Sequence, residues 1–207
     1  MFNTEAIVIY ITCYFIGSVP FAYLFVKLFS SKNITEEGSG NVGTLNAITV
    51  TKSKLVGVIV LLADLIKGIV PVYVMIFLLH VNFAVIMLGS AFLIFGHNYP
   101  VWLGFKGGRG LATGAGVFMI LNYYVVIAWC IIWLIFFMIY KKVLVANFAA
   151  TVVIPLYVVF INIFNLHVIA HKVSDFSGFY FILFSVIITF IILTRHTEVF
   201  KLFKTNN

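Results

Sequence analysis

From Leu111 to Tyr140, thirty consecutive residues carry no charged side chain. A single helix of this length would measure about 45 Å, whereas the hydrocarbon core of a bilayer is about 30 Å thick. Similar apolar runs recur along the 207-residue chain, which is 63% hydrophobic and only 9% charged. A soluble fold could not bury that much apolar surface, and a β-barrel would show short alternating segments instead. The sequence therefore predicts an all-α fold, a polytopic integral membrane bundle.

Polar connections divide the chain into apolar runs that predict the membrane spans. The longest run fits either one long tilted helix or two short passes that break near Asn122. Two passes place Lys141, Lys142 and the basic C-terminal tail in the cytoplasm, in agreement with positive-inside topology. We therefore expect about seven transmembrane helices, some of them short, with the N-terminus outside and the C-terminus cytoplasmic. The predicted spans are Ala6–Val26, Leu55–Leu79, Phe83–Phe95, the two halves of Leu111–Tyr140, Val143–Ile169 and Gly178–Leu193.

Prolines and charges inside these runs predict local features of the bundle. Pro20 and Pro155 are expected to kink their helices, and Pro71 is expected to redirect the second span. Asp64 and Lys67 are three residues apart on one helix face, where they can pair. A structural ion pair and a functional site both fit this pair. No internal repeat or linker interrupts residues 1–207, which predicts a single domain.

Charge and cysteine content exclude some classes of protein and site. The net charge of +7 comes mostly from basic residues in short connections, so membrane topology explains it more simply than nucleic-acid binding does. Cys13 and Cys130 lie within apolar runs and have no partner at a recognisable spacing, which indicates neither a disulfide framework nor a metal site. We therefore expect no nucleic-acid partner, no metal and no cofactor.

Two polar connections are rich in glycine, and both are predicted to lie on the cytoplasmic side. The second glycine loop, Gly104–Thr113, combines four glycines with Lys106 and Arg109, a composition that suits phosphate oxygens. The first glycine loop, Gly38–Asn46, contains a literal G-x-G-x-x-G pattern. A dinucleotide site would need a βαβ unit, which a loop between spans cannot supply, and a plain surface turn is the alternative. The presence of two such loops favours a shared anion site.

Three clusters converge on the predicted cytoplasmic face: the first glycine loop, His97–Thr113 and Arg195–Lys201. Their motifs and the flanking ones are Gly17-Ser18-Val19-Pro20, Tyr23-Leu24, Glu37–Gly43, Asn46, Asp64–Gly68, Gly96-His97, Pro100, Phe105–Gly110, Ala112-Thr113 and Arg195-His196. In this order they cover most of the chain. Together they resemble the motifs of the bacterial acyl-phosphate:glycerol-3-phosphate acyltransferase family, usually called the PlsY type.

The resemblance implies a small integral membrane enzyme of seven helices whose active site opens to the cytoplasm. Such enzymes move an acyl group from acyl phosphate to the 1-hydroxyl of glycerol 3-phosphate. They form lysophosphatidic acid and phosphate in the first step of phospholipid synthesis. The resemblance implies these substrates and membrane lipid as partners, and a multi-pass location in the cell (inner or plasma) membrane. We also expect a monomer. The His-x-x-x-x-Asp pattern of a different acyltransferase class is absent, so acyl-CoA is the less expected donor.

The same resemblance assigns candidate site residues. Ser39 is expected to hydrogen-bond rather than to act as a nucleophile, because no histidine or acid adjoins it in sequence. His196 would orient substrate or accept a proton, a phosphate oxygen of the donor is the alternative base, and an interfacial position at a helix end also fits this histidine. The predicted catalytic residues are Ser39, Asn46, Arg109 and His196. The predicted substrate- and phosphate-binding residues are Gly38, Gly40, Asn41, Gly43, Lys52, His97, Lys106, Gly107, Gly108, Gly110 and Thr113.

The chain departs from the family pattern at four positions. Leu45 stands where the family has threonine, and Thr49 stands where it has an arginine. Lys52, one helical turn further on, is a candidate replacement for that lost charge. Arg109 replaces a lysine, and Val199 replaces an asparagine. These differences leave two alternatives open: a weak or inactive paralogue that binds lipid or a partner, and an anion or lipid transporter.

Overall fold

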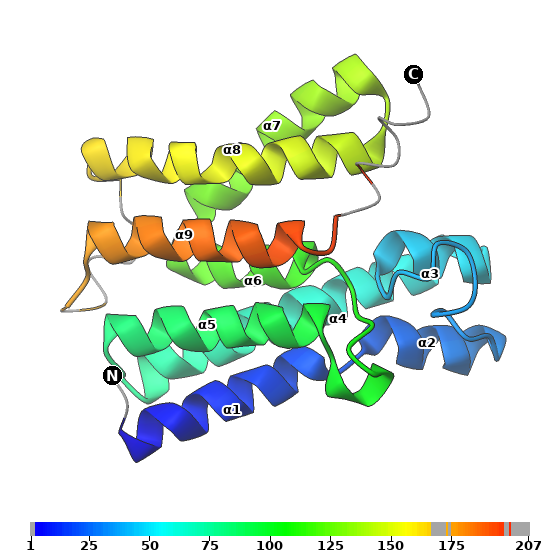
Figure 1. Ribbon diagram of the computed structural model, residues 1–207, viewed down its shortest axis with the longest axis horizontal. Coiled ribbons are helices and arrows are strands. Elements are labelled where there is room, and N and C mark those ends of the chain that lie inside the picture. The colour runs from blue at the N-terminus through cyan, green and yellow to red at the C-terminus, as the bar shows by residue number, and fades with distance from the viewer. Residues whose placement is uncertain (1–2, 167–172, 174, 197–198, 200–207) are drawn as a thin grey trace.

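The computed structural model describes residues 3–166, 173, 175–196 and 199. Every regular element in this part of the chain is helical, which confirms the predicted all-α class (Figure 1). The elements are α1 (Thr4–Ser18), α2 (Phe21–Ser30), α3 (Thr44–Thr51), α4 (Lys54–Tyr73), the π-helical turn η1 (Val74–Leu78), α5 (Phe83–Asn98), the 3-10 turn η2 (Val101–Leu103), α6 (Leu111–Leu121), α7 (Tyr123–Tyr140), α8 (Val143–Ile163) and α9 (Gly178–Leu193).

Within the described residues, five helical stretches are long and apolar enough to cross a membrane, and two shorter apolar helices accompany them. The five are Thr4–Ser30, Lys54–Leu78, Phe83–Leu103, Tyr123–Tyr140 and Val143–Ile163, and the shorter ones are Leu111–Leu121 and Gly178–Leu193. All seven fall on the predicted apolar runs. The boundaries differ most for the third run, which continues past Phe95, and for the sixth, whose helix ends at Ile163. Residues 167–169, which were predicted to end the sixth span, lie outside the described residues.

Prolines act differently from one helix to another. Pro20 separates two helices, α1 and α2, where the sequence predicted a kink within one. By contrast, α8 continues through Pro155. Helix α4 also continues through Pro71 and then changes into the wider turn η1. The helix type therefore changes close to the point where a redirection was predicted.

The longest apolar run is divided by Asn122, as predicted, into α6 and α7. The Asn122 amide donates to the carbonyl of Leu166, and its side-chain oxygen accepts from the N–H of Tyr124. With 11 residues, α6 is only about 16 Å long, so it needs cover from neighbouring helices. That cover is present, since Val117 and Leu121 are fully buried.

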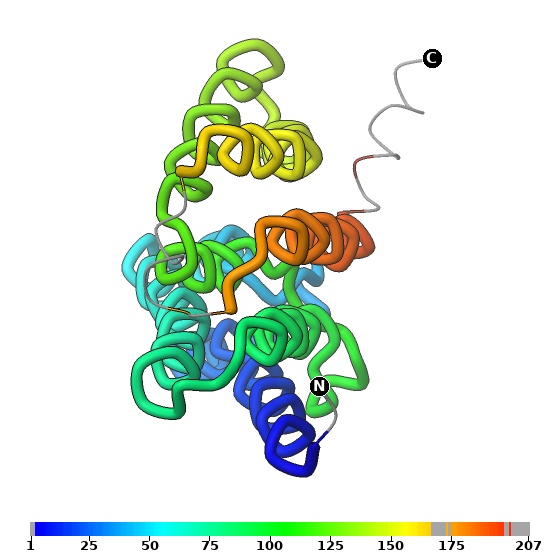
Figure 2. Tube along the Cα trace, turned by 90° about the vertical axis from the view of Figure 1, so that its left-hand side faces the viewer, coloured from blue at the N-terminus to red at the C-terminus, as the bar shows by residue number. Residues whose placement is uncertain are grey.

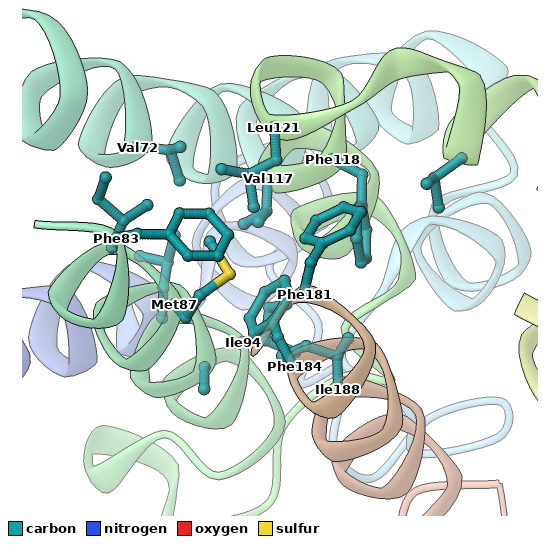
Figure 3. Packing of buried hydrophobic residues seen from close by; sticks show 14 of the residues in the cluster. Val72, Phe83, Met87, Ile94, Val117, Phe118, Leu121, Phe181, Phe184 and Ile188 are labelled. Atoms are coloured by element: carbon teal, nitrogen blue, oxygen red, sulfur yellow. The ribbon is translucent and has the colours of Figure 1, made fainter. Parts of the chain in front are cut away.

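The helices run side by side along the long axis of the molecule (Figure 1). Seen end-on, α1, α4 and α5 form one side of the bundle, α6 and α9 lie in the middle, and the hairpin of α7 and α8 forms the other side (Figure 2). Helix α5 is central, with twelve of its 16 residues buried, whereas α7 buries only Val125. The largest apolar cluster includes Phe83, Phe118 and Phe181, from α5, α6 and α9 (Figure 3).

Glycines allow α4 and α6 to approach closely near the end of the bundle that carries both glycine loops, which we call the loop end. A Cβ atom on Gly68 would collide with the carbonyl oxygen of Thr113 and lie 3.1 Å from the Cα of Gly116. A Cβ on Gly116 would collide with the carbonyl oxygen of Leu65. Small residues commonly permit such contacts between membrane helices. The contact brings Asp64, one turn before Gly68, next to the start of α6.

Candidate active site

A buried cluster of charged and polar side chains connects α4, α5 and α6. Lys67 Nζ lies 2.8 Å from Asp64 Oδ1, which confirms the predicted pair. The same ammonium group donates to the carbonyl of Val19 at 3.0 Å, in the break between α1 and α2. His97 Nδ1 lies 3.5 Å from Asp64 Oδ1 and 3.2 Å from Thr113 Oγ1. Because an unpaired charge at this depth is costly, the cluster holds these helices in one arrangement.

The first glycine loop is fastened by the side chain of Asn46. Its Oδ1 accepts from the N–H of Ser39 at 2.9 Å, and its Nδ2 donates to the carbonyls of Ile34 and Glu37 at 3.1 and 3.0 Å. Gly38 has a φ of +61°, and a Cβ there would collide with Asn46 Oδ1. Both donors of the buried amide are therefore used inside the protein. In this structure the Asn46 side chain thus holds the first glycine loop in place, and its catalytic role stays a prediction.

The other residues of the first glycine loop divide between surface and interior. The Ser39 side chain is exposed, and its Oγ accepts from the N–H of Asn41 at 3.4 Å. Gly40 also turns with positive φ, at +69°. Gly43 is the N-cap of α3 and has no side-chain cap. Asn41 and Gly43 line the cavity described below, whereas Ser39 and Gly40 are not among its lining residues.

The backbone of the second glycine loop is held by hydrogen bonds to α5 and to the side chain of Arg195. The N–H groups of Gly107 and Gly108 donate to the carbonyls of Asn98 and His97. Arg195 Nη2 donates to the carbonyl of Gly107 at 2.8 Å, and its Nε donates to that of Gly108 at 3.4 Å. The two glycine N–H groups were predicted to bind phosphate, but they are already used within the protein. Their role in this structure is to seat the loop on α5.

Gly108 also brings the two glycine loops together. A Cβ on this residue would collide with His97 Nε2 and lie 2.6 Å from the carbonyl oxygen of Val42, in the first loop. Only a residue without a side chain leaves room for this three-way contact. The position of Arg109, the next residue, follows from it.

A cavity of about 370 Å³ lies between the loops. Its lining residues are Asn41, Gly43, Thr44, Leu45, Leu61, Asp64, His97, Arg109, Gly110, Leu111, Ala112, Trp129, Trp133, Val143 and Asn147. Five predicted site residues are among them: Asn41, Gly43, His97, Arg109 and Gly110. Buried polar groups that gather in a cleft with apolar walls are typical of binding and catalytic sites.

Several predicted site residues are not brought to this cavity. Lys52 is exposed at the C-terminal end of α3, about 12 Å along the helix from Thr44 at the cavity. Lys106 is exposed on the second glycine loop, and Thr113 lies behind His97. His196 is fully buried, with Nδ1 at 2.9 Å from the carbonyl of Ile192. The expected replacement of the family's arginine by Lys52 is therefore not supported by this geometry.

Two polar residues that shape the site, Asn147 and Arg195, are not among the site residues predicted from the sequence. Asn147, on α8, lines the cavity, and its Oδ1 accepts from Trp133 Nε1 at 2.7 Å. The available signal was an asparagine four residues before Thr151 in an apolar helix, where polar residues are costly. Arg195 was noted only as part of a motif. Its function as the clamp of the second glycine loop depends on residues 87 and 88 positions away.

An apolar cavity of about 220 Å³ adjoins the polar one and shares Leu61, Leu111, Ala112 and Trp129 with it. Its other lining residues are Leu65, Gly114, Ala115, Phe118, Val125, Val126, Cys130, Thr151, Ile154, Ser185, Ile188, Thr189 and Ile192. The hydroxyl groups in this wall donate to backbone carbonyls: Thr151 to Asn147, Ser185 to Ile182, and Thr189 to Thr151. Because these donors are already satisfied, the wall suits an apolar ligand.

Comparisons with known proteins agree with the motifs and the membrane fold. The family profile described as Glycerol-3-phosphate acyltransferase matches residues 7–205. A glycerol-3-phosphate acyltransferase of Pelagibacter ubique is 32% identical over 78% of this chain and 82% of its own length. One of Bartonella quintana is 38% identical over 73% of this chain and 72% of its own length.

Solved structures resemble the whole bundle. The crystal structure of PlsY (YgiH), an integral membrane glycerol 3-phosphate acyltransferase, matches in its glycerol 3-phosphate form with a TM-score of 0.80 and 27% identity, over 98% of this chain and 93% of that one. Its lysophosphatidic acid form matches over the same shares, with a TM-score of 0.76 and 26% identity. These comparisons do not favour a transporter. The chain is an integral membrane protein that belongs to the glycerol-3-phosphate acyltransferase family.

Proposed function

We propose that the polar cavity is the active site, at which an acyl group passes from acyl phosphate to the 1-hydroxyl of glycerol 3-phosphate. The observation that carries this proposal is the junction of two cavities. A polar cavity containing Arg109 adjoins an apolar cavity whose wall has no unsatisfied hydroxyl donor among Thr151, Ser185 and Thr189. An acyl phosphate has this same division into an anionic head and a hydrocarbon tail. The names of the relatives support glycerol 3-phosphate as the acceptor.

The reaction needs charge stabilisation more than covalent help from the protein. The 1-hydroxyl oxygen attacks the carbonyl carbon, the bond from that carbon to the phosphate oxygen breaks, and phosphate leaves with the electron pair. A phosphate oxygen of the donor takes the hydroxyl proton, so lysophosphatidic acid and phosphate are the products. Because acyl phosphate is already activated, correct placement and stabilisation of negative charge supply most of the required catalysis.

Arg109 is the residue best placed to hold a phosphate group. Among the residues that line the polar cavity, Asp64 and Arg109 are the ionised side chains, and Lys67 balances the charge of Asp64 at 2.8 Å. The guanidinium of Arg109 therefore places a cationic group in this lining. Its planar set of donors fits phosphate oxygens, and charge-assisted bonds of this kind are about twice as strong as neutral ones. Asn41 and Asn147 provide amide groups on two sides of the same space.

The distribution of basic residues supports a cytoplasmic active site. Among the described residues, every lysine and arginine except the paired Lys67 belongs to the connections or helix ends at the loop end: Lys27, Lys32, Lys52, Lys54, Lys106, Arg109, Lys141, Lys142 and Arg195. By the positive-inside rule this end faces the cytoplasm. We therefore propose a multi-pass protein of the cell membrane, monomeric and of one domain, that uses no metal and no cofactor.

The activity is tested with purified protein in lipid nanodiscs. Acyl phosphate and glycerol 3-phosphate are supplied, and lysophosphatidic acid and released phosphate are measured together. The proposal predicts equal amounts of both products, and little product when acyl-CoA replaces acyl phosphate. A preparation that is folded but forms no lysophosphatidic acid, beside an active control enzyme, would contradict the enzymatic function. Product formed from acyl-CoA alone would contradict the proposed donor.

A further inference from the structure

We propose that Phe118 closes the far end of the apolar cavity and thereby sets the length of acyl chain that the enzyme accepts. This inference rests on the proposed function, because it assigns the apolar cavity to the acyl tail of the donor. It adds a specificity-determining residue and a direction in which the tail must extend. Three observations carry it: the order of residues along the cavity, the packing of the Phe118 ring, and the chemistry of the wall.

The lining residues define two ends of the apolar cavity. Leu111 and Ala112, at the start of α6, also line the polar cavity and therefore mark the end at which the head group would lie. Phe118 lines only the apolar cavity, seven residues and about 10 Å further along the same helix. Val125, just after the break between α6 and α7, accompanies it there. An acyl tail that starts beside Arg109 would thus run along α6 toward Phe118.

The Phe118 ring is backed by other rings at this far end. Its centroid lies 5.6 Å from that of Phe184 and 6.2 Å from that of Phe181 (Figure 3). Phe118 itself is only 6% exposed, and Phe181 and Phe184 are buried behind it. Neither of the two backing rings lines the cavity. A ring fixed in this way is a rigid end wall, because close-packed interiors leave little room for it to move.

A rigid end wall gives selectivity by chain length. Each methylene that gains a place in an apolar cavity contributes about fourfold in affinity, which corresponds to ~0.8 kcal/mol. Chains shorter than the cavity lose that contribution for every missing methylene. A longer chain must displace the ring or leave part of its tail outside the cavity. The preferred chain is therefore the one whose end reaches Phe118.

The test uses two opposite changes on α6 and one matched control. Phe118→Leu removes ring atoms from the end wall, and Ala115→Leu fills the cavity one turn nearer to the head group. Phe83→Leu makes the same substitution at a fully buried ring that does not line the cavity. For each variant, kcat/KM is measured with a series of saturated acyl phosphates of increasing chain length, and the values are compared within the series. We expect Phe118→Leu to shift the optimal chain length upward and Ala115→Leu to shift it downward. For each methylene that gains or loses its place in the cavity, kcat/KM should change by about fourfold. Phe83→Leu should keep the wild-type profile.

A second readout does not need turnover. Thermal unfolding in detergent is followed with lysophosphatidic acids of increasing chain length, since a ligand that binds the folded state raises the unfolding midpoint. The chain length that stabilises most should move in the same directions in the two α6 variants. Unchanged optima in both readouts for Ala115→Leu and Phe118→Leu would overturn the proposal; should Phe118→Leu fail to fold, Ala115→Leu decides alone. Failure of the proposed function is distinguishable, because the wild type would then transfer no acyl group of any length.

Discussion

The two glycine loops both line the same cavity, but they are held in different ways. The first is fastened locally, by Asn46, whose partners are Ser39 and two carbonyls within twelve residues. The second is fastened from a distance, by Arg195, which reaches it from beyond the end of α9. Each loop thus has one side chain that supports it. Other residues of the two loops, Asn41 in the first and Arg109 in the second, then line the cavity.

This difference separates residues that support the site from residues that face it. Gly107 and Gly108 serve the packing of the second loop, and the next residue, Arg109, reaches the cavity. In the first loop, the Asn46 side chain is hydrogen-bonded to backbone groups of the protein, whereas Asn41 lines the cavity. A motif residue can therefore support the site without lining the cavity. The following variants test that division.

The largest effect is expected for Arg109, the cationic side chain in the cavity lining. Replacing it with alanine should lower kcat/KM by about 10²- to 10³-fold, as does the loss of a donor to developing negative charge elsewhere. Thermal unfolding should change little. Arg109→Lys keeps the charge and should retain part of the activity. Wild-type kinetics in the alanine variant would show that Arg109 does not hold phosphate.

Asn46 should affect stability first and activity as a consequence. Asn46→Ala leaves two carbonyls and the Ser39 N–H without their partner, at a cost of about 3 kcal/mol in the free energy of unfolding. The unfolding midpoint in detergent measures this loss. Ser39→Ala is the matched control, because the Ser39 side chain is exposed and its backbone N–H remains. An Asn46→Ala variant that is inactive but as stable as wild type would instead support the predicted catalytic role.

Arg195 should act through the placement of the second loop. Arg195→Lys keeps the charge but cannot bond two adjacent carbonyls with one planar group. We expect KM for glycerol 3-phosphate or acyl phosphate to rise by about tenfold, which equals ~1.4 kcal/mol, with a smaller change in kcat. Steady-state kinetics in both substrates provide the measurement. A lysine variant with unchanged KM would show that charge alone, without the clamp, is sufficient.

The smallest effect is expected for Lys52, which the sequence suggested as a replacement for the family's arginine. Its exposed position at the far end of α3 predicts that Lys52→Ala changes kcat/KM by less than about twofold. The same assay as for Arg109 applies. Loss of activity comparable to that of Arg109→Ala would restore the replacement and would assign a second cation to the first loop.

Much of the architecture was predictable because it depends on local patterns. The apolar runs, the division at Asn122 and the pair of Asp64 with Lys67 each follow from residues close together in sequence. The extension of the third run beyond Phe95 was missed, since Gly96, His97 and Asn98 resemble a loop by composition. Burial on all sides of α5 overrides that preference. Tertiary packing of this kind leaves no local signal.

The site was predictable in outline but not in its division of roles. Both loops were expected to meet, and the cavity between them contains Asn41 and Arg109. Asn147 was missed because its partner, Trp133, and the opposite wall come from other helices. The clamp formed by Arg195 was missed for the same reason. Contacts between residues that lie tens of positions apart in the sequence cannot be predicted from motif spacing alone.

The sequence by itself determined that this chain is a helical membrane protein of an acyltransferase family. Long apolar runs leave no other way to satisfy the backbone in a bilayer, and the ordered motifs identify the relatives. The tertiary structure alone decided which motif residues face the cavity. The physical reason lies in competition for partners: an N–H group, an amide or a guanidinium can bind a ligand or another part of the chain. Only the folded arrangement places the Asn46 and Arg195 side chains against the backbones of the loops and Arg109 in the lining of the cavity.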